Sequence, residues 1–132
     1  MIGINDKIIF DKELKIFYIK EIDLDLNMEF LILGGNKNTE YVVIYKCNLN
    51  YNANIYITKI ISTLFAQNFP NVVTADLSHN NLGSDIVNDI ITLMFICKKL
   101  TSIDLSYNNF SSNDIECLQK AEKQYPNLKL YF

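Results

Sequence analysis

An internal repeat constrains this chain more than any other feature. Residues 72–82 and 100–110 both follow the pattern L-x-x-L-x-L-x-x-N-x-L, with related apolar residues at some of the Leu positions. Leu77 and Leu105 hold the same place in the two copies, which gives a 28-residue period. Such a period is typical of proteins in which each unit buries its apolar face only by stacking on its neighbours.

Two further features support this period. The lead-in Phe-Pro-Asn-Val at 69–72 recurs as Tyr-Pro-Asn-Leu at 125–128, two periods later. A weaker copy spans 39–49 and has Cys47 where the other copies have Asn. The step from its Ile44 to Leu77 is longer than the period by five positions, and we place the extra residues in the Asn-rich stretch 48–54.

The three copies resemble the leucine-rich-repeat family, and the 28-residue period resembles its ribonuclease-inhibitor-like class. The resemblance covers residues 39–132. It implies an α/β fold, a short right-handed solenoid with parallel strands on the concave side and helices on the convex side. It also implies that the chain binds another protein.

Within each copy the apolar residues alternate as in a strand, whose successive side chains point to opposite faces. We therefore expect an inward set consisting of Val42, Ile44, Ala75, Leu77, Ile103 and Leu105. Asn80, Asn108 and Cys47 follow where the chain turns away, and we interpret them as structural repeat positions. A buried Asn amide there can pair with backbone groups of the neighbouring turns, whereas Cys is a weaker donor.

Between the strands the apolar spacing becomes helical, at 57–65, 86–97 and 115–121. Ser84 or Asp85 is the expected N-cap of the second helix. Asn113 and Glu116 have the separation of a capping box for the third helix.

Residues 1–35 do not follow the period. Residues 7–10 and 14–19 flank a polar turn at 11–13 and predict a β-hairpin. Residues 22–26 alternate, and a β-like run at 28–33 ends at Gly34 and Gly35. We interpret 1–35 as an N-terminal β cap or a degenerate repeat, and 36–132 as repeats of which the last is incomplete, all in one structural domain.

Composition excludes several classes of function. The net charge is -3, and the twelve basic residues are all lysines, so neither nucleic acid nor an anionic membrane is an expected partner. No apolar run reaches the roughly 20 residues that span a bilayer. The three cysteines lie at no metal-ligand spacing, and the first residues lack the pattern of a secretory signal. We expect no metal or cofactor and a cytoplasmic or other reducing intracellular location, with secretion by a non-classical route left open.

The residues that invite a catalytic interpretation have a simpler one. His79 is the only histidine and lies close to Asp76 and Ser78. However, Asp104 and Ser106 repeat the same Asp-Leu-Ser framework without a histidine, so we expect no enzyme. The two Asp residues lie one repeat apart and could hold a cation, but a solvated polar column is the preferred interpretation. Cys97 is expected in the core and Cys117 at the surface.

The outward positions of the strands form columns across the repeats, and we expect four of them: Tyr41, Thr74 and Ser102; Val43, Asp76 and Asp104; Tyr45, Ser78 and Ser106; and Lys46, His79 and Tyr107. Candidate partner-binding residues on this concave face are Tyr41, Tyr45, Asp76, His79, Asp104 and Tyr107. Extension by one further period places Phe132 in the column of the two Asp residues. We expect a protein-interaction module that uses this face. The alternative is a structural or self-associating protein, a homodimer that pairs through an uncapped C-terminal strand.

Overall fold

The structure is a computed structural model that describes residues 2–4, 8–11, 13, 15–21, 37–47 and 69–132. The predicted runs at 22–26 and 28–33, the Asn-rich stretch 48–54 and the first expected helix at 57–65 lie outside the described residues.

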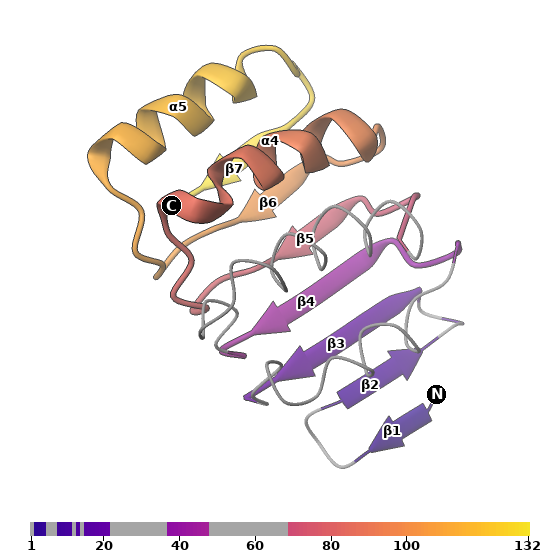
Figure 1. The fold of residues 1–132 in the computed structure, drawn as a ribbon. Coiled ribbons are helices and arrows are strands. Elements are labelled where there is room, and N and C mark those ends of the chain that lie inside the picture. The colour runs from indigo at the N-terminus through magenta and orange to yellow at the C-terminus, as the bar shows by residue number, and fades with distance from the viewer. Residues whose placement is uncertain (1, 5–7, 12, 14, 22–36, 48–68) are drawn as a thin grey trace.

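The described strands form one seven-stranded sheet whose spatial order follows the chain (Figure 1). They are β1 (Ile2–Ile4), β2 (Ile8–Asp11), β3 (Ile16–Lys20), β4 (Tyr41–Tyr45), β5 (Thr74–Asp76), β6 (Ser102–Asp104) and β7 (Lys129–Tyr131). Strand β2 is antiparallel to both of its neighbours, β1 and β3, whereas β3 to β7 run parallel. The chain is therefore α/β, with five parallel strands in one sheet.

The predicted hairpin near the N-terminus is confirmed. Strands β2 and β3 pair antiparallel, with Phe10 opposite Phe17, and the backbone N–H of Glu13 donates to Asp11 Oδ1 in the turn (3.1 Å). Strand β3 then pairs parallel with β4, with Ile16 opposite Tyr41. It therefore both closes the hairpin and begins the parallel part of the sheet.

The expected inward set is confirmed. Its six members are at most 1% exposed, and Phe17 and Ile19 of β3 are fully buried in the same core. Burying a Val, Leu or Ile side chain stabilises a fold by roughly 1.5–3 kcal/mol, so these columns set the register of the parallel strands.

Two helices of the described part of the chain pack on the inward face of the sheet. A 3-10 turn, η3 (Ser84–Ile86), leads into α4 (Val87–Ile96), and α5 (Ser112–Glu122) follows β6. Ile90, Leu93 and Met94 of α4 and Leu118 of α5 belong to the same core as the inward strand residues. Figure 1 shows the two helices side by side over the β6–β7 end of the sheet.

The predicted helix caps are wrong in both cases. Helix α5 is capped by Ser111, whose Oγ accepts from the Asp114 N–H (3.1 Å) while Asp114 Oδ2 accepts from the Ser111 N–H (2.9 Å). This capping box begins two residues before Asn113, which lies inside the helix. Ser84 and Asp85 lie inside η3, which starts after Gly83, and α4 has no side-chain cap.

The register of β7 also differs from the prediction. Asp104 pairs with Tyr131, so Tyr131 and not Phe132 continues the Asp column. The lead-in keeps the 28-residue step, because Leu100 and Leu128 are both buried. Inward Ile103 comes three residues after Leu100, but inward Leu130 comes only two after Leu128. The expected strand beside β6 is nevertheless present.

Candidate functional site

The sheet face opposite the helices carries all six candidate binding residues, at the outward positions of β4 to β6 and in the turns after them. We call this surface the open face. The strand pairing confirms two of the expected columns, Tyr41–Thr74–Ser102 and Val43–Asp76–Asp104. Ser78, which was expected to face outward beside Tyr45 and Ser106, is buried at 4% exposure and is not available to a partner.

The carboxylates of Asp76 and Asp104 on the open face accept hydrogen bonds from residues just after their own strands. Asp76 Oδ1 accepts from the Ser78 N–H (2.9 Å), and Asp104 Oδ1 accepts from both the N–H and the hydroxyl of Ser106 (2.9 and 2.6 Å). The repeated Asp-Leu-Ser framework is therefore a strand-end turn, as expected for side chains that bond the backbone two residues on. No ion pair involves either Asp within the described part of the chain.

A residue with a left-handed backbone conformation follows each of the strands β3, β4, β5 and β6. Lys46, His79 and Tyr107 have φ of 54°, 59° and 56°, and Glu21 after β3 has φ of 54°. For a residue with a Cβ this conformation is costly, so surrounding contacts must hold it in place. The sequence did not reveal this left-handed conformation, because none of the four positions is the Gly that usually marks such a turn.

Three of the candidate residues form an aromatic stack at this rim of the open face. The His79 ring lies 4.3 Å from the Tyr107 ring at an interplanar angle of 17°, and 4.9 Å from the Tyr45 ring in an edge contact. The Tyr107 side chain is 76% exposed. His79 Nδ1 is buried and has no hydrogen-bond partner among the described residues, so its ring is positioned by the two tyrosine contacts and not by a hydrogen bond to Asp76 or Ser78.

Asn80 and Asn108 explain how these turns are held. Asn80 is fully buried; its Oδ1 accepts from the Cys47 N–H (2.8 Å), and its Nδ2 donates to the carbonyls of Ile44, Leu77 and Ser78 (2.6, 2.9 and 3.0 Å). Each amide thus joins its own turn to the preceding one, and it pairs backbone groups that would be costly to leave unpaired.

Asn108 repeats this arrangement one step along the sheet. Its Oδ1 accepts from the N–H groups of Asn80 and Leu82 (2.9 Å each). Its Nδ2 donates to the carbonyls of Leu77, Leu105 and Ser106 (3.1, 3.0 and 3.3 Å). Cys47 retains the donor half of this arrangement, because its Sγ donates towards the carbonyls of Tyr45 and Ile19 (3.2 and 3.6 Å).

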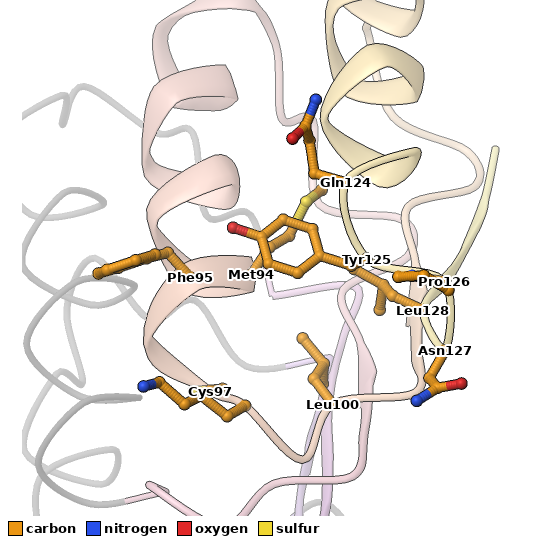
Figure 2. A pocket seen from close by; sticks show the side chains of 10 residues that line it. Met94, Phe95, Cys97, Leu100, Gln124, Tyr125, Pro126, Asn127 and Leu128 are labelled. Atoms are coloured by element: carbon orange, nitrogen blue, oxygen red, sulfur yellow. The ribbon is translucent and has the colours of Figure 1, made fainter.

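A second surface feature lies on the helical side of the sheet. Figure 2 shows a pocket of about 300 Å³ between the end of α4 and residues 124–128. Its walls include Met94, Leu100, Tyr125 and Leu128, and the exposed Phe95 ring stands at its rim. Cys97 also lines it, but burial raises the pKa of that thiol to about 11, so it is not a nucleophile at neutral pH.

No group of three or more His, Cys, Asp or Glu side chains that could hold a metal ion occurs among the described residues. In the same part of the chain, no helix combines the length and apolar character needed to cross a bilayer. Cys97 is buried and Cys117 is exposed, as the sequence predicts.

Comparison with known families identifies the repeating unit. Residues 99–121, which contain β6, the Asn108 turn and most of α5, match the family model described as Leucine Rich Repeat. This segment is a leucine-rich repeat. No curated protein and no solved structure matches the chain.

The preceding unit has the geometry of this leucine-rich repeat. Strand β5 pairs with β6 at the 28-residue offset, and the Asn80 and Asn108 amides make corresponding bonds. The unit that starts at β4 shares the register and the left-handed residue, but has Cys47 in place of Asn. The structure thus brings Tyr45, His79 and Tyr107 into contact, whereas Tyr41 lies at the opposite end of β4 and is 44% exposed.

Proposed function

We propose that this chain is a non-catalytic protein-interaction module that binds a protein partner through the open face. The leucine-rich repeat at 99–121 supports a protein-interaction role, since such repeats are typical of interaction modules. In the proposed architecture, the parallel strands line the concave side of a short right-handed solenoid, and β1 and β2 cap its first layer. Assignment of the 28-residue period to the ribonuclease-inhibitor-like class belongs to the same proposal.

The aromatic stack is the observation that carries the proposal. Its central ring is held between two tyrosines, and the Asn80 and Asn108 bonds fix the turns that bear the rings. Tyr107 therefore offers a large surface at little further loss of conformational freedom on binding. Exposed tyrosines on a rigid support are frequent anchors in protein interfaces.

Charge and chemistry favour a protein over other partners. The open face combines Asp76 and Asp104 with Lys20 at the end of β3 and Lys46 after β4, and the chain contains no Arg for phosphate recognition. The family is generally non-enzymatic, and the Asp carboxylates are engaged by the Ser turns rather than by His79. The single S–H of Cys47 is shared between the carbonyls of Tyr45 and Ile19, so the thiol is reduced, which fits a reducing intracellular compartment.

Self-association through β7 ranks second. Strand β7 lies at the edge of the sheet, where an unpaired strand can accept another chain. We place it below partner binding because the backbone N–H of Leu130, in the middle of β7, already donates to Glu122.

A matched pair of exposed aromatic residues tests the proposal. Tyr107 is 76% exposed on the open face, and Phe95 is 67% exposed on the helical side. A binding protein captured by the wild-type chain is purified, and its affinity is measured for Tyr107→Ala and Phe95→Ala. We expect Tyr107→Ala to weaken binding at least tenfold, which corresponds to about 1.4 kcal/mol, and Phe95→Ala to leave it unchanged. The reverse pattern would place the interface on the helical side and contradict the proposal.

A further inference from the structure

The edge of the sheet at β7 is closed by a side chain from the preceding helix. The Lys129 N–H donates to the Thr101 carbonyl (2.9 Å), and the Tyr131 carbonyl accepts from the Leu105 N–H (2.7 Å). The backbone groups of Lys129 and Tyr131 therefore face β6. Successive residues of a strand direct these groups to opposite edges, so the N–H of Leu130 points away from the sheet.

The side chain of Glu122 accepts a hydrogen bond from this outward N–H. Its Oε2 accepts from the Leu130 N–H at 2.6 Å, in a part-buried position. Because the acceptor is ionised and the bond is short, it is stronger than a neutral backbone bond. Leu130 is the central residue of β7 and the only one whose N–H faces outward, so a strand that joins this edge must displace Glu122.

The position of Glu122 on its helix supports a role of this kind. Glu122 is the last residue of α5, at the helix end where the dipole disfavours a negative charge. Helix stability alone therefore gives no reason for a carboxylate here. A side-chain acceptor that occupies the outward donor of an edge strand, by contrast, leaves that donor unable to pair with another chain.

We propose that Glu122 is an edge guard, a carboxylate that keeps the β7 edge from pairing with β7 of a second copy of this chain. The exposed side chains of Lys129 and Tyr131 flank the guarded donor, and the buried Leu130 side chain fixes the strand against the core. The guard acts at a different surface from the open face. Its failure therefore leaves the proposed partner binding untouched, and the two are tested separately.

Three substitutions in the full chain separate the hydrogen bond from the charge. Glu122→Gln keeps an acceptor of the same length and removes the charge. Glu122→Asp keeps the charge but is one methylene too short to reach Leu130 in this geometry. Glu122→Ala removes both properties. Sedimentation velocity across a concentration series measures self-association, and circular dichroism checks that each variant is folded.

The wild type and Glu122→Gln should remain monomeric throughout the micromolar range. Glu122→Asp and Glu122→Ala should dimerise with a dissociation constant at least tenfold lower than that of the wild type. Hydrogen exchange should show the Leu130 amide becoming more protected as the concentration of these two variants rises. Glu122→Asp, as the more conservative change, provides the test if Glu122→Ala does not fold.

Monomeric behaviour of folded Glu122→Asp would overturn the proposal. Dimerisation of the wild type with protection of the Leu130 amide would also overturn it, because the guard would then not close the edge. Dimerisation of Glu122→Gln together with a monomeric Glu122→Asp would overturn it as well, because charge repulsion and not the occupied donor would then keep the chains apart.

Discussion

The turn that follows β4 differs from those that follow β5 and β6, although all three have a left-handed residue at the corresponding position, which is Lys46, His79 or Tyr107. The turn after β5 has a second left-handed residue at Asn81. After β5 and β6, an Asn amide both accepts from and donates to backbone groups, and so joins two turns in both directions. After β4, the Cys47 thiol donates to two carbonyls at 3.2 and 3.6 Å.

This difference shows which part of the side chain the turn requires. The donor function is present in all three turns, since each side chain reaches the carbonyl of a preceding strand or its own strand. The bridge from an Asn acceptor to the preceding turn is observed after β5 and β6. We therefore expect the stability of the chain to depend most on the two Asn residues and less on Cys47.

Replacement of Asn80 by Ala should have the largest effect. Asn80 is fully buried, so the substitution removes the partner of the Cys47 N–H and of the Ile44 carbonyl at a site out of reach of water. We expect a loss on the order of 3 kcal/mol in the free energy of unfolding. Urea denaturation followed by circular dichroism measures it, and a loss below that of Asn108→Ala would contradict this ranking.

Replacement of Asn108 by Ala should cost about 1–3 kcal/mol. The same kinds of backbone groups lose their partner, but Asn108 is only part-buried, so water can reach some of them. The same urea titration applies. An unchanged denaturation midpoint would show that this Asn is not a structural repeat position.

Replacement of Cys47 by Ala should cost about 1 kcal/mol or less, because a thiol is a weak donor and the cavity left behind is small. Here the backbone N–H of Cys47 keeps its bond to Asn80. A loss as large as that of Asn80→Ala, measured under reducing conditions, would mean that the two kinds of turn are equivalent after all.

The smallest effect on stability should come from the hydrogen bond between Ser84 and Asp114, which joins the helical parts of neighbouring repeats. It is also the only one of these effects that should depend on pH. Two hydrogen bonds hold the pKa of the Asp114 carboxyl below its ordinary value of 3.8. The larger cause is the bond that Asp114 accepts from the Ser111 N–H, and the second is the bond that its Oδ2 accepts from the Ser84 hydroxyl (2.8 Å). This contribution to stability is therefore present above pH 3.8 and is lost as the pH falls through the lowered value.

Asp114→Asn is the control for this pH dependence. The wild type should lose more stability than the variant between neutral and acid pH, as measured by urea midpoints across that range. Identical acid dependence in the two proteins would show that the capping box contributes nothing through its charge. The Asn80 bonds, which contain no titratable group, should not change over the same range.

The sequence predicted those features of the fold that recur. The inward columns and the pairing of β4, β5 and β6 follow from a repeated apolar pattern, and so do the positions of Cys47, Asn80 and Asn108. The one-residue shift at β7 could not be predicted, since the lead-in before Leu128 matches the period and only the strand after it slips. The cap of α5 was missed because Ser111–Asp114 and Asn113–Glu116 have the same separation.

The site was predictable only as a list of residues that share a face. Alignment placed Tyr45, His79 and Tyr107 near one another, but not their stacking, which depends on the left-handed backbone at His79 and Tyr107. The contact of Glu122 with Leu130 joins a helix end to a strand edge and has no counterpart in the repeat pattern. Contacts that occur once have no periodicity from which to predict them.

Hydroxyl-radical footprinting of the chain with and without its protein partner tests the central claim most directly. Tyr107 and Phe95 are both well exposed in the free chain, so both should be oxidised readily. If the open face is the interface, the partner should protect Tyr107 strongly and leave the oxidation of Phe95 unchanged. Protection of Phe95 with full oxidation of Tyr107 would contradict the account.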